Sequence, residues 1–331
     1  MSYRLGFTGD VMLGRLVDEH QRSQAVTAVW GDLLDLLRDL DGLFVNLECC
    51  LSTRGEPWQR TDRPFHFRAD PDWAVPALDA AGVDYCSLAN NHILDYEVPA
   101  LRDTIDHLDE AGIAHAGAGR TREEAFAPAH VAVGSLDVGV VSLTDNTPEY
   151  AAGEASPGTA RVEFDLDDAS SRAAVNEALD RAADADPDLV VASLHWGPNM
   201  VTEPPEAFRE FGRWLVDRGV DIVHGHSAHV VQGIEVYDGR PICYDCGDFV
   251  DDYAVDDDLR NDRSFLFELT VTDRGEPTEL RLRPVQIYDF AVHRASPDVA
   301  DWSRERMRER SAALGTTFER EGAALVLDLG E

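Results

Sequence analysis

The stretch Tyr3-Arg4-Leu5-Gly6-Phe7-Thr8-Gly9-Asp10 decides the fold class, because a short apolar run there ends in a glycine and a carboxylate. The run predicts a strand over residues 3–8. A second apolar run over 42–46 leads to Glu48 in the same way, and an amphipathic helix is predicted over 25–40 between the two runs. Strand, helix and strand in this order are typical of an α/β protein.

Helical and strand patterns keep alternating along the rest of the chain. We predict helices over 71–81, 98–111, 169–185, 205–218 and 297–320. Further strands are predicted over 85–88, from 113, and over 129–133, 138–143, 189–194, 221–223, 234–237, 241–244, 265–272 and 278–287. This order indicates two packed sheets with helices outside them. We place one main domain over 1–290 and a C-terminal helical extension, packed on that domain, over 291–331.

The composition of the chain is acidic. Its 331 residues include 63 Asp and Glu against 29 Lys and Arg, which gives a net charge of −34. Nucleic acid is therefore excluded as a partner bound by bulk charge. Hydrophobic residues make up 44% of the chain, which argues against general disorder. Every basic residue is Arg, and we hypothesise a halophilic source, since molar salt screens the repulsion between carboxylates.

Several features bear on the compartment. The five cysteines are an odd number, and the first residues carry no secretory pattern, so we expect a cytoplasmic protein. No apolar run approaches the roughly 18 residues that a spanning helix needs, so no stable membrane insertion is expected. Cys243 and Cys246 form a C-x-x-C pair, for which core packing is the simpler interpretation than a zinc or redox site. The oligomeric state stays open.

Polar residues that are able to bind metal follow many of these strands. The carboxyl ends of adjacent strands converge in space, so we expect these side chains to meet. Carboxylate, amide and imidazole groups together suit Mn, Fe or Zn, and the set is large enough for two ions. A single aspartate after a strand is more often a helix cap or a turn residue, but that alternative weakens for the whole set. The candidate ligands are Asp10, Glu48, Asn91, His195, His226 and His229.

Other polar residues near these motifs suggest roles toward a substrate. His92 follows a candidate ligand and is the candidate general acid, although a buried, hydrogen-bonded histidine is the alternative. Arg15 is the best candidate among the nearby arginines for binding an anionic group, with surface charge balance as the alternative. Asn90 and Asp248 are further candidates for contact with the substrate. Asp248 has two alternatives, namely orienting a ligand histidine and a simple adaptation to acidity.

The order and separation of these motifs resemble those of the CapA family, named for capsule poly-gamma-glutamate biosynthesis. That family is similar to the calcineurin-like metallophosphoesterases. The resemblance extends from about residue 3 to residue 253 and implies a four-layered α/β/β/α sandwich with a dinuclear site at the strand ends. The motifs that carry it are Gly9-Asp10, Asn46-Leu47-Glu48, Ala89-Asn90-Asn91-His92, His195-Trp196-Gly197, Gly225-His226-Ser227-Ala228-His229-Val230-Val231-Gln232 and Gly247-Asp248-Phe249.

The resemblance implies a role for each matching residue. Asp10 corresponds to the aspartate of the first motif, and Glu48 stands where metallophosphoesterases have the bridging aspartate. The sequence departs from the superfamily at Met12, where a histidine ligand is usual, so the resemblance leaves open whether one or two ions bind. The remaining roles are those of ligand for Asn91, acid for His92, and ligands for His195, His226 and His229.

Three functions follow from this set of residues. The first is a metal-dependent hydrolase, most simply a phosphoesterase, acting on a small-molecule or polymer substrate. The second, from the family name, is a non-hydrolytic accessory role in the synthesis of poly-gamma-glutamate, capsule or another cell-envelope polymer. The third is a binding module that has lost one metal and turnover, which Met12 would favour. Retention of so many histidines at strand ends favours the hydrolase.

Overall fold

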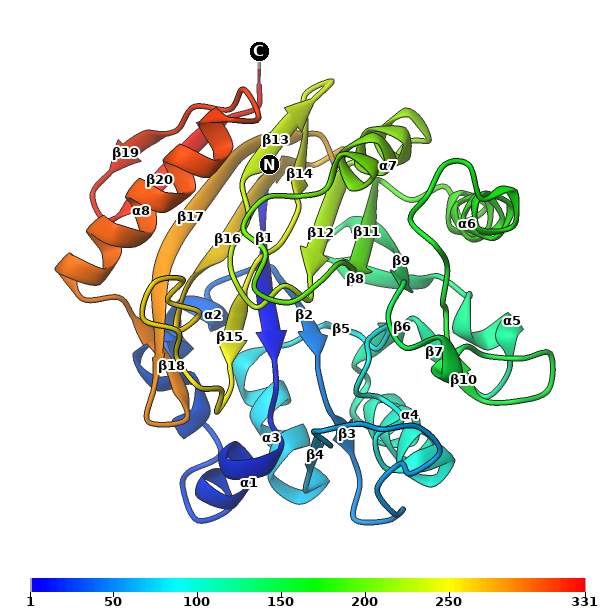
Figure 1. The fold of residues 1–331 in the computed structure, drawn as a ribbon. Coiled ribbons are helices and arrows are strands. Elements are labelled where there is room, and N and C mark those ends of the chain that lie inside the picture. The colour runs from blue at the N-terminus through cyan, green and yellow to red at the C-terminus, as the bar shows by residue number, and fades with distance from the viewer. Residues whose placement is uncertain (1, 331) are drawn as a thin grey trace.

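The computed structural model describes residues 2–330 and contains two large β-sheets (Figure 1). The ten-stranded sheet runs in the order β19-β20-β17-β16-β1-β2-β5-β6, with β15 beside β1 and β18 beside β17. Its strands are β1 (Ser2–Val11), β2 (Gly42–Leu47), β5 (Tyr85–Ser87), β6 (Ala114–Ala116), β15 (Asp248–Val250), β16 (Arg263–Thr272), β17 (Pro277–Tyr288), β18 (Ala291–Arg294), β19 (Glu319–Glu321) and β20 (Ala324–Asp328).

The second sheet has six strands in the order β13-β14-β12-β11-β9-β8. They are β8 (Ala129–Val133), β9 (Leu136–Thr144), β11 (Leu189–His195), β12 (Ile222–His226), β13 (Ile234–Tyr237) and β14 (Arg240–Cys243). Two small strand pairs lie apart from it: β3 (Cys50–Leu51) with β4 (Arg68–Ala69), and β7 (Ala118–Gly119) with β10 (Gly158–Thr159).

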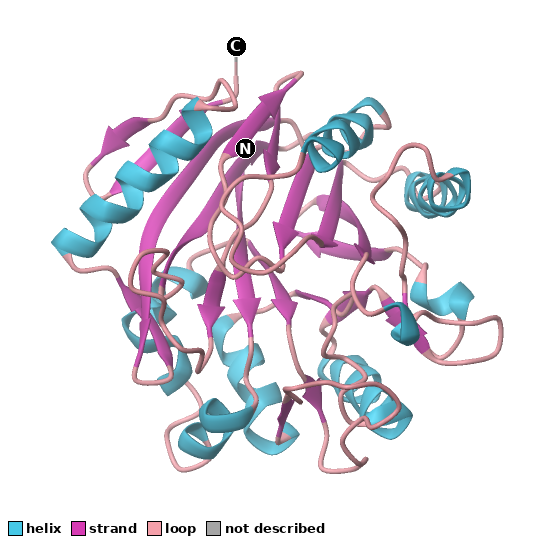
Figure 2. Ribbon diagram, viewed as in Figure 1, coloured by secondary structure: helices cyan, strands magenta, loops and turns pink. Residues whose placement is uncertain are grey.

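Helices lie outside the two sheets, and the strands form the middle of the molecule (Figure 2). The α-helices are α1 (Arg15–Gln21), α2 (Leu34–Arg38), α3 (Pro71–Ala81), α4 (Glu97–Ala111), α5 (Arg122–Ala125), α6 (Ala169–Ala183), α7 (Glu206–Asp217) and α8 (Pro297–Ala312). Two 3-10 helices, η1 (Ala28–Leu33) and η2 (Pro148–Tyr150), complete them.

Three hydrophobic cores separate four layers. In β2, Phe44 packs between the two sheets, whereas Val45 and Leu47 face α3 and α4, as the alternation of side chains along a strand requires. The core between the sheets joins β1 and β2 to β9, β11 and β12. A third core packs α6 and α7 on the outer face of the six-stranded sheet. This arrangement confirms the expected α/β/β/α sandwich.

Parallel pairing brings the strand ends together. β1 runs parallel to β2 and to β15, and its Asp10 pairs in register with Asn46 and Asp248. In the other sheet, β11 and β12 are parallel, and His195 pairs with His226. Because the two sheets pack face to face, the carboxyl ends of these strands form one polar region.

Two of the predicted helices differ clearly from the structure. The helix predicted over 25–40 is instead η1 followed by α2, because Gly31 adopts a φ of +48° inside the segment. The helix predicted over 297–320 ends at Ala312, and the chain then forms β19 and β20, of which β20 pairs with β17. Residues after 290 therefore add strands to the main sheet as well as a helix. The domain boundary at residue 290 stays a prediction.

Two other observations concern residues 2–330. None of their helices combines the length and the hydrophobicity that crossing a membrane requires. All five cysteines are buried and unpaired, as the packing interpretation expects.

Candidate metal centre

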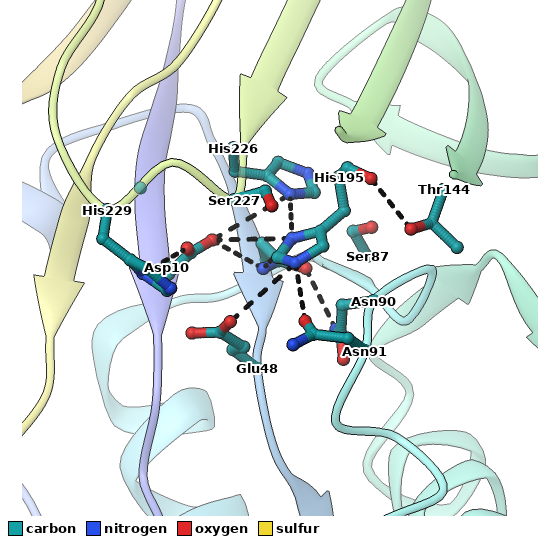
Figure 3. A network of polar contacts seen from close by, with 12 residues as sticks. Asp10, Glu48, Ser87, Asn90, Asn91, Thr144, His195, His226, Ser227 and His229 are labelled. Atoms are coloured by element: carbon teal, nitrogen blue, oxygen red, sulfur yellow. Dashed lines mark hydrogen bonds and ion pairs between the residues drawn. The ribbon is translucent and has the colours of Figure 1, made fainter. Parts of the chain in front are cut away.

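Two groups of possible metal ligands meet at the strand ends and share Asp10. One group joins Asp10 to His195 and His226, and the other joins Asp10 to Glu48, His229 and Asp248. Within each group, one ligand atom of each residue lies within 4.8 Å of the others. Figure 3 shows most of these side chains pointing toward one another from β1, β11, β12 and the loops that follow β2 and β12.

The first group is built around two neutral imidazoles. Nδ1 of His195 and Nδ1 of His226 lie 2.9 Å apart, and they are 4.0 and 3.9 Å from Asp10 Oδ1. Burial lowers the pKa of His195 to about 3 and that of His226 well below its usual range. The other nitrogen of His226 lies 3.0 Å from Ser193 Oγ, which fixes the ring. Unprotonated imidazoles are the form that binds metal.

The second group gathers three buried carboxylates around one imidazole. His229 Nδ1 donates to Asp248 Oδ1 at 2.9 Å and lies 3.4 Å from Asp10 Oδ2. Burial opposes the charge on His229, but the charges of Asp248, Glu48 and Asp10 outweigh it and raise its pKa well above the usual range. Burial and the charge of Asp10 raise the pKa of Glu48. Burial also raises the pKa of Asp248 to about 6, against the charge of His229.

Oxygen atoms without partners indicate that the second group is suited to a cation. Asp10 Oδ2, Glu48 Oε1 and Asp248 Oδ2 are buried and have no hydrogen-bond partner among the described residues. The charge of a protonated His229 faces all three carboxylates, and a cation bound in its place would leave the imidazole unprotonated, the form that binds metal. Hard oxygen and borderline nitrogen ligands together fit a divalent transition metal. The residues present therefore fit the metal that the sequence predicts.

Asparagines contact one of the carboxylates, Asp10, and one of the histidines, His195. Asn46 Nδ2 donates to Asp10 Oδ1 at 2.7 Å, and Asn90 Nδ2 donates to Asn46 Oδ1 at 3.1 Å. Asn91 Oδ1 lies 2.8 Å from His195 Nε2, so the amide oxygen that the sequence predicts as a ligand faces the first group. Asn90 is buried, and its side-chain amide is already hydrogen-bonded to Asn46. It does not line the cavity where a substrate contact was expected.

Asp248 contacts the candidate ligand His229, as one of the two alternatives for it expects. It is fully buried beside Asp10, among the candidate ligands, and it does not line the cavity where a substrate contact was expected. Met12 is buried as well, in the hydrophobic core on the side of α3 and α4, and its Sδ accepts a hydrogen bond from the backbone of Gly14. Asp248 is therefore a carboxylate ligand candidate in a centre that lacks the histidine usual at residue 12.

His92 is held by an aspartate that the sequence analysis did not single out. His92 Nδ1 donates to Asp95 Oδ2 at 2.5 Å, and its Nε2 lies 4.0 Å from Glu48 Oε1. Asp95 also accepts hydrogen bonds from the backbone of Phe67 and from the hydroxyl of Tyr150. Burial lowers the pKa of His92 despite the opposing charge of Asp95. The only sequence signal for Asp95 is an acidic residue three positions after the histidine.

A cavity of about 720 Å³ opens onto this centre and is bordered by Asn91, His92 and His229. Arg15 and Arg63 also border it. Tyr253 lines it too, and its hydroxyl donates to Glu48 Oε2 at 2.9 Å. The predicted anion-binding residue Arg15 thus faces the same cavity as the candidate acid. Tyr253 was missed because no sequence pattern relates it to Glu48.

The backbone is strained next to the ligands. Ser227 has a φ of 113° and His229 a φ of 60°, although neither residue is a glycine. Such conformations persist where the surrounding structure imposes them, often at functional sites. His224 lies nearby in β12, but its Nε2 donates to the carbonyl of Thr8 at 2.6 Å, so its role is structural.

Comparison with known families extends this description. A model of bacterial capsule synthesis proteins, PGA_cap, matches residues 4–253, which contain every candidate ligand. The chain belongs to the PGA_cap family. The CapA resemblance read from the motifs is thereby confirmed.

Relatives in this family carry names from polymer synthesis. A probable polyglutamine synthesis accessory protein of Mycobacterium tuberculosis is 36% identical over 301 residues, covering 86% of this chain and 77% of that protein. The PGA biosynthesis protein CapA of Bacillus subtilis is 27% identical over 283 residues, covering 82% and 72%. The capsule biosynthesis protein CapA of Bacillus anthracis is 29% identical over 272 residues, covering 81% and 63%. Among solved structures, purple acid phosphatase PPD1 from yellow lupin seeds superposes with a TM-score of 0.40 at 10% identity, over 89% of this chain and 53% of that one.

Proposed function

We propose that this PGA_cap protein is a metal-dependent hydrolase that cleaves phosphate esters. The observation that carries the proposal is the pair of ligand groups sharing Asp10, beside a cavity that His92 also lines. Asp10, Glu48, His229 and Asp248 would hold one Mn, Fe or Zn ion, and Asp10, Asn91, His195 and His226 a second. A divalent ion bound there polarises a phosphoryl oxygen and makes water a stronger nucleophile.

The side chains of the protein supply the other parts of the reaction. Asp95 fixes His92 with Nδ1 as the donor, which leaves Nε2 at the cavity wall, 3.0 Å from Asn91 Nδ2 and 4.0 Å from Glu48 Oε1. As an imidazolium, with protons on both nitrogens, His92 would pass its Nε2 proton to the leaving oxygen of an ester bound in the cavity and keep its Nδ1 proton toward Asp95. Arg15 borders the cavity and is suited to bind the anionic end of the substrate.

A second candidate function is a non-hydrolytic accessory role in the synthesis of poly-gamma-glutamate or another envelope polymer. The names of the relatives support it, since they describe accessory and biosynthesis proteins. A metal centre in such a protein would bind the polymer without turnover.

The decisive experiment is a hydrolysis assay in molar KCl with Mn, using a chromogenic phosphomonoester and a chromogenic phosphodiester. We expect turnover of at least one of them by the natural chain and its loss in His92→Ala, with the metal content unchanged. His130→Ala is the matched control, because that histidine pairs with Asp137 on the surface. Metal-loaded protein that turns over neither ester would contradict the hydrolase and favour the accessory role.

A further inference from the structure

The cavity beside the metal centre has an apolar rim. Phe65 and Val255 both line it, and they expose 53% and 48% of their surface. Only three other large hydrophobic side chains in residues 2–330 are comparably exposed: Leu16, Val26 and Tyr288. Single exposed hydrophobic residues are ordinary on a protein surface, but two that border one cavity form an area that a ligand is able to cover.

An aromatic surface connects this rim to the reacting end of the cavity. The rings of Phe65 and Phe67 are stacked, with centroids 6.4 Å apart, and Phe67 in turn stacks on His92 at 3.8 Å. Tyr253, which donates to Glu48, lies 5.8 Å from Phe67. A ligand that lies along these rings has one end beside His92 and Glu48 and the other end at Phe65.

Arg15 supplies the positive charge beside this aromatic surface. Its guanidinium carbon lies 5.0 Å from the ring centroid of Phe65 and 5.5 Å from that of Phe67. Its Nε pairs with Asp252 at 3.2 Å, and its two terminal nitrogens have no hydrogen-bond partner in the described part of the chain. An arginine that is oriented by stacking and by an ion pair keeps those donors available for an anion.

The two terminal nitrogens of the second arginine of the cavity are already hydrogen-bonded. Arg63 donates to Thr147 Oγ1 and to the backbone carbonyl of Asn91, and it lies 3.7 Å from Asp95. The acidic residue Asp256 also lines the cavity. The cavity thus offers one available cation, an acidic neighbour and an apolar rim. These features suit a ligand with a single anionic group better than a polymer with many carboxylates.

We propose that the substrate is a phosphate ester of an apolar alcohol, with its phosphoryl group at Arg15 and the metal ligands and its hydrocarbon part along Phe67, Phe65 and Val255. This inference rests on the proposed phosphoesterase function and names its substrate class. Phe65 and Val255 are the residues that set the preference for apolar alcohols. Both are exposed, so replacing them should leave the fold intact.

Calorimetric titration of the Mn-loaded protein with methyl-, butyl- and hexylphosphonate tests the proposal, because phosphonates bind as phosphate esters do but are not hydrolysed. We expect affinity to rise with chain length, by up to about fourfold for each methylene that is fully buried. Val255→Ala, which leaves the Phe65 ring beside Arg15 in place, should bind methylphosphonate as the natural chain does and lose part of the dependence on length. The double variant Phe65→Ala, Val255→Ala should lose most of that dependence. Val26→Ala, an exposed residue outside the cavity lining, is the matched control and should change neither.

Replacement of the arginine separates the two parts of the site. Arg15→Gln should weaken all three phosphonates by a similar factor and keep the dependence on length. Equal affinity of the natural chain for the three ligands would overturn the apolar-alcohol proposal while leaving the phosphoesterase standing. The apolar-alcohol proposal would also be overturned if the affinity of the double variant for the phosphonates depended on chain length as strongly as that of the natural chain. If the metal-loaded protein binds none of the phosphonates, the proposed phosphoesterase function is overturned together with this inference.

Discussion

His92 and Asp95 form a buried pair in which Nδ1 of the histidine donates to Oδ2 of the aspartate at 2.5 Å. The pair fixes which nitrogen of His92 faces the cavity. In Asp95→Asn the amide can present its NH₂ group to Nδ1, which would favour the other tautomer. We expect hydrolysis of a chromogenic phosphate ester to fall by about 10²-fold, the lower end of what general acid catalysis contributes.

The control for that variant is Asp109→Asn, because Asp109 accepts a hydrogen bond from His115 on the surface, 3.1 Å away. It should hydrolyse the ester at the rate of the natural chain. Asp95→Asn should also keep its bound metal, since Asp95 belongs to neither ligand group. Full activity in Asp95→Asn would mean that His92 does not transfer the proton.

Two histidines of one strand should respond differently to replacement. His226 belongs to a ligand group, whereas His224 donates to the carbonyl of Thr8 at 2.6 Å. We expect His226→Ala to lose bound metal on dialysis. His224→Ala should keep the metal but lose about 1–3 kcal/mol of unfolding free energy, because it leaves the buried carbonyl of Thr8 without its partner. Elemental analysis and thermal unfolding of both variants distinguish these results, and equal metal loss in both would contradict the assignment.

Gly9 lets β15 approach β1 closely enough to place Asp248 beside Asp10. A Cβ atom at Gly9 would lie 1.9 Å from the carbonyl oxygen of Gly247, which is backbone and has to move. We expect Gly9→Ala to lose about 1–3 kcal/mol of stability and to bind metal more weakly. Gly139→Ala is the control in a strand, since the nearest atom to its Cβ would be a side-chain carbon 3.3 Å away. Unchanged metal affinity in Gly9→Ala would show that Asp248 is not a ligand.

The net charge of −34 predicts a strong effect of salt on stability. Repulsion between carboxylates destabilises the compact state at low ionic strength, and salt screens it. The free energy of unfolding, measured by denaturant titration, should therefore rise from dilute buffer to molar KCl. Equal stability in the two conditions would contradict a halophilic adaptation.

Much of the site was predictable because its residues follow strands whose apolar patterns are clear. The ends of β1, β2, β11 and β12 lie within a few residues of the predicted ones, and the polar residues after them do converge. Asp95 and Tyr253 were not predictable in the same way. Their roles depend on contacts made across the fold, which local spacing does not encode.

The burial of Asp248 and the end of the last helix show the same limit. Closeness in sequence to a motif does not predict how deeply a residue is buried. The burial of Asp248 follows from the parallel pairing of β15 with β1. The charged helix over 297–320 was predicted too long because β19 is short and exposed, with no apolar alternation to mark it. Its pairing with β20 shows that it is a strand.

The measurement that tests the metal centre most directly is elemental analysis of the protein purified in molar salt, without chelator and without a nickel column. The two ligand groups predict about two transition-metal ions per chain. Asp10→Ala should lose both ions, because Asp10 is the residue that the groups share. A single ion would confine the centre to one group, and no metal in the natural chain would contradict the metal-dependent hydrolase.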